Sequence, residues 1–312
     1  MAKPKKKETV SVSFHYLVRM VGNGGKDALP VAFTSSDFDA LFGAIQAKAP
    51  FDPNDEEAAD RIRYRSDAPM ENVIRVDDRT VFGTYKGSYW GHAYDNTMRG
   101  RIPAESISLR PFHFLLYLSK SGRIYLASQY LGQFGGYSAL QRTISDLMPG
   151  AGFIMPHSVR LDGASYKNAQ AKEVKVTFAE KPASLAASNK ITSAGMIAFR
   201  KMSKEDGFEA EVAKRLFPFL GGPKNEMRKA IASMLNESSL MEVSESDIMD
   251  CTVLAKVNGG TKTIYMLESG NFATKFHIDV KVDDDGHPDY NQTKIAILDV
   301  LREEIISRSS DV

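Results

Sequence analysis

Lysine and arginine side chains concentrate in one short part of the chain, and phosphate binding is the chemistry that such a cluster can do. The cations fall within 30 residues, at Arg200, Lys201, Lys204, Lys214, Arg215, Lys224, Arg228 and Lys229. A lysine or arginine that meets a nucleic-acid phosphate releases counterions, so it adds affinity without reading base sequence. The cluster could equally be an ordinary solvated surface, because carboxylates lie among the cations at Glu205, Asp206, Glu209, Glu211 and Glu226.

A smaller group with the same chemistry lies in the first half of the chain. Arg99 and Arg101 flank a glycine in a polar loop, which suits either phosphate contact or turn geometry. The preceding segment holds four aromatic residues, Tyr85, Tyr89, Trp90 and Tyr94. They could stack on bases or could close the end of a sheet. We therefore keep Arg99 and Arg101 as reserve candidates for DNA contact.

Three glycines, Gly132, Gly135 and Gly136, precede a predicted helix, and this position allows two interpretations. Backbone N–H groups at a helix N-terminus attract phosphate. However, G-x-x-G-G is neither the dinucleotide fingerprint nor a P-loop, and no Lys-Ser/Thr pair follows it. The pattern favours a tight turn, followed by a helix that Ser138 could cap.

Signatures of known catalytic sites are missing from the sequence. It has no G-x-S-x-G elbow, H-E-x-x-H pair, Walker lysine or kinase motif. A metal-dependent nuclease could draw on Asp250, Glu268 and Lys275, which have the residue types but not the spacing. Cys251 is the only cysteine, which excludes an internal disulfide and a cysteine-based zinc site. We expect no catalytic residues, no metal and no cofactor.

Two predicted helices must position the cationic cluster. The first runs from Glu205 to Phe217 and the second from Lys224 to Leu235. Their apolar residues recur at helical spacing, at Phe208, Val212 and Leu216 in the first and at Met227, Ile231 and Leu235 in the second. Because these stripes face a core, most of the cations should point outward.

The rest of the chain predicts a mixed fold. Apolar runs bounded by turn residues indicate a first strand at Val10 to Val21 and hairpins at Phe112 to Leu131 and Cys251 to Leu267. An amphipathic helix is expected from Asn291 or Thr293 to about Ser307. The polar, proline-bearing stretch from Ala49 to Met70 is expected to be a surface excursion. The fold class is α/β (α+β), with two lobes of mainly antiparallel sheets and flanking helices.

Composition divides the chain into a tail and two lobes. Residues 1–8 are expected to be a basic disordered tail, 9–165 an N-terminal α+β lobe and 166–312 a C-terminal α+β lobe with the basic helices. No apolar run approaches the roughly 18 residues of a membrane-spanning helix. Together with the single cysteine, this predicts a soluble protein of the reducing cytoplasm.

The C-terminal third resembles RexA-like phage exclusion proteins. The likeness rests on the basic segment with its helix (Arg200 to Leu216), the hairpin sequence DCTVLAKVNGGTKTIYMLESG and the closing amphipathic helix (Thr293 to Ile306). The resemblance implies a cytoplasmic homodimer of two lobes that binds duplex DNA largely without sequence preference and acts in phage exclusion with a membrane protein partner. It brings no catalytic residues. The longer N-terminal half around Trp90 departs from the family.

Three functions follow as hypotheses. The first is a non-enzymatic, largely sequence-independent double-stranded DNA-binding protein in anti-phage defence. The second is a metal-dependent nuclease of a defence system, and the third is a protein-interaction or scaffolding module. The net charge of only +1 means that any DNA binding must come from cations gathered on one surface.

Overall fold

The computed structural model describes most of the chain. The described residues are 9–22, 28–48, 51–52, 54–65, 67–132, 134–150, 152–159, 166, 169–179, 195–201, 207–220, 222–237, 243–257, 259–267 and 274–308. The expected basic tail, residues 1–8, lies outside them. The chain divides into two compact units, which are described separately. Unit 1 comprises Met1–His157 and Ile278–Val312, and unit 2 comprises Ser158–His277.

Unit 1 is built on an antiparallel sheet with strand order β1-β8-β7-β4-β3, and the short strands β2 and β9 also pair with β1. Its strands are β1 (Val10–Val21), β2 (Leu29–Val31), β3 (Met70–Asp77), β4 (Thr80–Tyr89), β7 (Ser108–Leu118), β8 (Ile124–Leu131) and β9 (Phe153–Ser158). A separate two-stranded sheet is formed by β5 (Tyr94–Asn96) and β6 (Gly100–Ile102). The predicted hairpin at Phe112 to Leu131 is confirmed, with Leu116 paired to Leu126.

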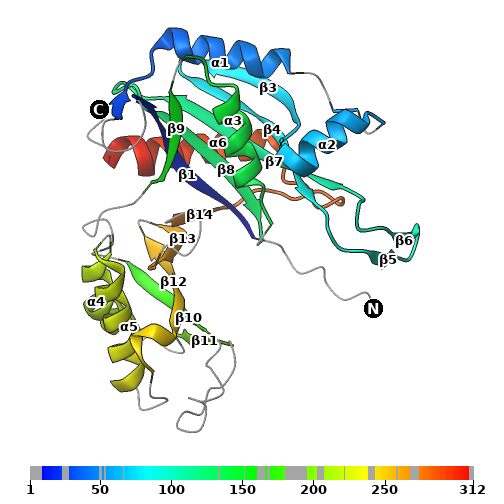
Figure 1. The fold of residues 1–312 in the computed structure, drawn as a ribbon. Coiled ribbons are helices and arrows are strands. Elements are labelled where there is room, and N and C mark those ends of the chain that lie inside the picture. The colour runs from blue at the N-terminus through cyan, green and yellow to red at the C-terminus, as the bar shows by residue number, and fades with distance from the viewer. Residues whose placement is uncertain are drawn as a thin grey trace. The chain divides into compact units, whose positions relative to one another are not determined.

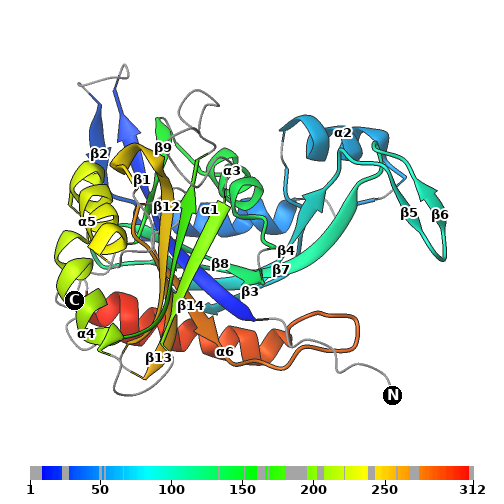
Figure 2. The ribbon, with the colours of Figure 1, turned by 90° about the horizontal axis from the view of Figure 1, so that it is seen from below.

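Helices cover both faces of this sheet (Figures 1 and 2). They are α1 (Ser35–Ala47), α2 (Glu56–Arg65), α3 (Tyr137–Asp146) and α6 (Tyr290–Val300), which continues as a π-helical turn η5 (Leu301–Ile305) and a 3-10 turn η6 (Ile306–Arg308). On the α3 face, the rings of Tyr137 and His15 stack at 3.8 Å. On the α6 face, His113 Nε2 lies 3.2 Å from the Pro288 carbonyl oxygen. Strand β8 is therefore buried along its whole length.

The glycine step before α3 allows close packing. The helix begins at Tyr137 with Gly136 as its N-cap and without a side-chain cap, so the predicted cap at Ser138 is wrong. A Cβ at Gly136 would lie 2.9 Å from the Cα of Gly87. The N–H of Gly136 donates to Tyr85 Oη at 3.2 Å. Gly132 adopts a φ of 58°, as the turn interpretation requires. The glycines thus bring α3 close to strand β4.

One local prediction for unit 1 is corrected by the structure. The stretch from Ala49 to Met70, expected to be a polar excursion, contains helix α2. Ala58 and Ile62 lie four residues apart in it and are buried. Two apolar residues at that spacing give a short helix a face to bury, even though its remaining residues are mostly charged.

Unit 2 is an antiparallel sheet with strand order β11-β10-β12-β13-β14. The strands are β10 (Gln170–Phe178), β11 (Gly195–Arg200), β12 (Ile248–Val257), β13 (Gly260–Tyr265) and β14 (Thr274–Ile278). The predicted hairpin at Cys251 to Leu267 is confirmed as β12 and β13. Its helical segments are α4 (Phe208–Arg215), η3 (Phe217–Phe219), α5 (Lys224–Glu237) and η4 (Glu245–Asp247). Buried and half-buried residues alternate along β10, because α4 and α5 cover only the apolar face.

The fold class is α+β, with antiparallel sheets and flanking helices as predicted. The division of the chain differs from the expected lobes, 9–165 and 166–312. Residues 278–312 group with unit 1, because α6 covers the face of the unit 1 sheet that contains His113. Unit 2 is therefore inserted between the two parts of unit 1.

Candidate nucleic-acid interface

Helices α4 and α5 of unit 2 carry most of the predicted DNA-binding cations. Helix α4 starts after Gly207, which has a φ of 69°, and it ends just before Pro218. Helix α5 follows Pro223. Of the predicted apolar stripes, Val212, Leu216, Met227, Ile231 and Leu235 are buried, whereas Phe208 is only half-buried. The burial of these stripes leaves the opposite surfaces of both helices for polar side chains.

Two of the predicted cations are neutralised within the protein. Lys201 Nζ lies 2.5 Å from Glu209 Oε1. Arg215 pairs through Nε with the Glu211 carboxylate and through Nη1 with Glu237 Oε2 at 2.5 Å. The hydrogen bonds that Arg215 donates to Glu211 and Glu237 raise the pKa of Arg215, and the bond that Glu237 accepts from Arg215 lowers the pKa of Glu237. These cations have less charge to offer a phosphate than their number in the sequence indicates.

Four other cations of this surface form no ion pair with the described residues. Lys214, Lys224 and Lys229 are exposed, and Arg228 is half-buried. The Nε of Arg228 is buried and has no hydrogen-bond partner within the described part of the chain. Lys204 lies outside the described residues.

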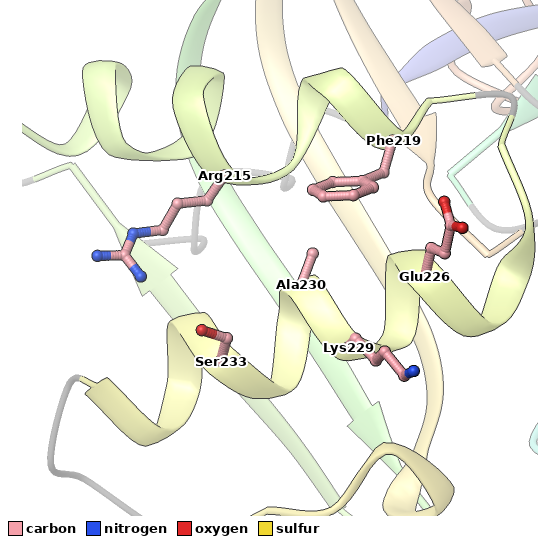
Figure 3. Close-up of a pocket in the computed structure, with 6 residues that line it drawn as sticks. All are labelled: Arg215, Phe219, Glu226, Lys229, Ala230 and Ser233. Atoms are coloured by element: carbon pink, nitrogen blue, oxygen red, sulfur yellow. The ribbon is translucent and has the colours of Figure 1, made fainter.

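A groove of about 410 Å³ lies between η3 and α5. Figure 3 shows its lining, with Arg215 and Phe219 on one side and Glu226, Lys229, Ala230 and Ser233 of α5 on the other. The Phe219 ring lies above Ala230, and Lys229 points away from the ring (Figure 3). The groove therefore has an apolar centre, and its charged groups lie at the edges.

A second groove, of about 710 Å³, lies on another side of α5. Its lining joins two cations that form no ion pair with described residues to hydroxyl and amide side chains and one carboxylate. The lining residues are Asn225, Arg228, Lys229, Ala232, Ser233, Asn236, Val243, Ser244, Glu245 and Ser246. The amide of Asn236 is held by the backbone of Val243, with Val243 N donating to Oδ1 at 2.7 Å. We call this set the α5 groove. Cations with hydroxyl and amide donors are the groups that bind phosphate oxygens in protein–DNA interfaces.

The reserve candidates belong to the other unit. Arg99 lies in the turn between β5 and β6 of unit 1, and Arg101 lies in β6 opposite Asp95. Both side chains are exposed. The predicted set is thus divided, with Arg99 and Arg101 on unit 1 and the other described candidates on unit 2.

The residue types considered for a nuclease are not brought together. Asp250 is in β12 and Lys275 is in β14, with β13 between the two strands, and Glu268 lies outside the described residues. Burial lowers the pKa of Lys275 to about 8. Within the described ranges, no group of three or more His, Cys, Asp or Glu side chains could hold a metal ion. None of the described helices is long and apolar enough to cross a membrane.

Sequence reasoning placed Glu209 and Glu211 among the cations but did not say which cations they pair with. It missed Glu237 and the polar residues that complete the α5 groove. The pairing of Glu211 with Arg215 has a signal, because residues four apart on a helix are neighbours. Glu237 and Ser244 have no such signal. Glu237 meets Arg215 of another helix, and Ser244 lines the α5 groove, and neither placement follows from a local pattern. Comparison with protein-family models, curated proteins and solved structures finds no match.

Proposed function

We propose that the protein is a non-enzymatic DNA-binding protein that contacts the phosphates of duplex DNA through the α5 groove and the cations beside it. The observation that carries this proposal is that Arg228 and Lys229 line a groove with hydroxyl and amide side chains and form no ion pair with described residues. Lys214 of α4 and Lys224 of α5 are also exposed and form no ion pair with described residues. These groups contact phosphates rather than base edges, so binding would not depend on sequence.

The small number of cations that have no ion pair with described residues limits the expected affinity for DNA. Each phosphate contact changes the slope of log affinity against log salt by about −0.9. Binding that rests on a few such contacts falls in the nonspecific range, with Kd on the order of 10⁻⁴ to 10⁻⁶ M at physiological salt. Association of two copies of the chain would double the number of contacts, so a homodimer is part of the proposal.

The biological role proposed here follows from the resemblance to RexA-like proteins. In this role, the dimer would act in phage exclusion in the cytoplasm, together with a membrane protein partner. A cell that expresses the protein should then form fewer plaques than a cell that expresses a variant without duplex binding. Equal plaque numbers for the two would remove this role and leave the DNA binding itself to be judged by the assay below.

The direct test is a charge reversal at exposed positions. Reversing Arg215 would not be clean, because it would place a new carboxylate beside Glu211 and Glu237. Lys224 and Lys229 are exposed and form no ion pair with described residues, so Lys224→Glu with Lys229→Glu should leave the fold intact. The matched control is Lys281→Glu with Arg302→Glu, which reverses two exposed cations of unit 1.

The readout is binding of a labelled random duplex at two salt concentrations, with and without magnesium. The α5 double variant should bind more weakly to every duplex, and its salt slope should flatten by roughly two. The control should keep the slope of the parent. Parent-like binding by the α5 variant would overturn the proposed interface, and cleavage that requires magnesium would favour the nuclease.

A further inference from the structure

The hairpin of β5 and β6 in unit 1 extends beyond the main sheet. Strands β4 and β7 pair as far as Tyr89 and Ser108, and Gly91 N then donates to the Ala104 carbonyl oxygen at 3.0 Å. The chain continues into the two-stranded sheet of β5 and β6, which is separate from the main sheet. Figures 1 and 2 show this ribbon leaving the edge of unit 1. We call residues 90–104 the arm.

The arm exposes apolar side chains that a fold normally buries. Met98 at its tip is 91% exposed, Tyr94 is 50% exposed and Trp90 is 48% exposed. Every residue from Gly91 to Arg101 is exposed, and the Tyr94 hydroxyl lies 3.4 Å from Ser108 Oγ of β7. An apolar group held out in this way is typical of a surface that meets a partner.

The tip of the arm is ordered by its own hydrogen bonds. Asn96 Oδ1 accepts from Met98 N at 2.9 Å and from Arg99 N at 3.0 Å. Gly100 closes the turn with a φ of 73°. This Asx-type turn presents Met98 at the apex without support from a core. The hydrogen bonds therefore fix the backbone from which the Met98 side chain projects.

The charge of the arm points to a polyanion. Arg99 and Arg101 are exposed and form no ion pair with described residues, whereas Asp95, opposite Arg101, is the only carboxylate in the arm sequence. The arm therefore combines an apolar tip with an excess of positive charge. A two-stranded ribbon can enter either the major or the minor groove of duplex DNA. An apolar side chain favours the minor groove, where such side chains wedge between base steps.

We infer that the arm inserts into the minor groove of duplex DNA, with Met98 as the wedge and Arg99 and Arg101 on the flanking phosphates. The inference rests on the proposed duplex binding but uses a different unit and different residues. Insertion of a wedge unstacks a base step and bends the duplex. The arm would thus change the shape of the DNA, whereas the α5 groove would only hold its backbone.

The protein carries a built-in reporter for this contact. Trp90 is the single tryptophan of the chain and lies half-exposed at the base of the arm. Its fluorescence should change when duplex is added to the full chain. Arg99→Ala with Arg101→Ala should weaken this titration by roughly three- to tenfold. Lys224→Glu with Lys229→Glu should shift its midpoint and leave its amplitude at saturation unchanged.

The wedge is tested by energy transfer between dyes at the two ends of a short duplex. The parent should bend the duplex, and Met98→Ala should remove at least about half of the change in transfer at saturating protein. The matched control is Met196→Ala, which truncates a methionine of unit 2 that is 60% exposed. This control should bend the duplex like the parent.

The outcomes separate the arm from the α5 groove. Duplex binding without a Trp90 signal, or full bending by Met98→Ala, would overturn the arm proposal and leave the α5 groove standing. Arm variants that weaken binding while the α5 variant binds like the parent would uphold the arm and overturn the α5 groove. A Trp90 blue shift with phosphatidylserine vesicles and none with duplex would assign the arm to a lipid surface and overturn the inference.

Discussion

The strands of unit 1 and those of unit 2 are covered differently. In unit 1, helices lie on both faces, and every residue of β8 is buried. In unit 2, α4 and α5 lie on one face, and along β12 the buried residues Cys251 and Val253 alternate with the half-buried Thr252 and Leu254. A two-residue period of burial marks a sheet with one covered face, and its loss marks a sheet covered on both. A substitution that removes apolar atoms should therefore lower the free energy of unfolding more in the strands of unit 1 than at the half-buried positions of unit 2.

The largest difference is expected for one residue type at matched positions. Leu116 is fully buried in the central strand β7, and Leu254 is half-buried in the central strand β12. Leu116→Ala should lower the free energy of unfolding by about 2–5 kcal/mol through lost burial and a cavity. Leu254→Ala should cost less than about 1 kcal/mol. Urea denaturation followed by circular dichroism measures both, and equal costs would contradict the difference in coverage.

A smaller effect is expected at a polar group inside unit 1. The Tyr85 hydroxyl is buried, lies 2.8 Å from Ser128 Oγ and accepts from Gly136 N at 3.2 Å. Burial raises the pKa of Tyr85 far above its usual value. Tyr85→Phe should cost about 1–3 kcal/mol, because it leaves the buried Ser128 hydroxyl and the half-buried Gly136 N–H without this partner. Tyr117→Phe, at a half-buried tyrosine, is the control, and a cost as large as that of Tyr85→Phe would argue against a specific role of the buried hydroxyl.

How far could the sequence predict these features? The apolar runs gave the strands β1, β7, β8, β12 and β13, because a strand and its tight turn are local in sequence. Helical spacing likewise placed the buried residues of α4 and α5. The assignment of α6 to unit 1 could not be predicted, since it depends on contacts such as that of His113 with Pro288, which are 175 residues apart.

The candidate site was predictable in position but not in charge. The sequence located the cations of α4 and α5, yet it gave Lys201, Arg215 and Lys229 equal weight. The structure distinguishes them, because Lys201 and Arg215 are ion-paired, whereas Lys229 has no ion pair with a described residue. Pairing depends on side chains that the fold brings within a few ångströms, and charge counts do not contain that information.

The smallest expected effect is a dependence of stability on pH. Burial lowers the pKa of His113 in unit 1, where the Pro288 carbonyl and Asp289 act in the opposite direction and His287 adds to the lowering. Burial also lowers the pKa of His277 in unit 2, with help from Lys275 and Lys172. Below the ordinary value of 6.5, the unfolded chain then binds more protons than the folded one. Stability is therefore present above that pH and is lost as the pH falls below it.

Protonation of His113 should cost more stability than protonation of His277, because the strands of unit 1 are covered on both faces. His113 is buried in a sheet covered on both faces, whereas His277 is half-buried. His113→Gln should reduce the loss of stability between about pH 7.5 and about pH 5.5 more than His277→Gln does. Urea midpoints at the two pH values measure this. A larger effect of His277→Gln would show that coverage of the sheet does not set the cost of protonation.

The insertion of unit 2 into unit 1 also has a consequence for the order of events during synthesis. A ribosome completes β1 to β9 first, then the whole of unit 2, and only afterwards the segment that forms α6. Domains fold as units while the chain is being made. Unit 2 can therefore fold while the α6 face of the first sheet, which includes Phe82 and His113, still lacks its cover. Helix α6 therefore completes the cover of the unit 1 strands only after unit 2 has been synthesised.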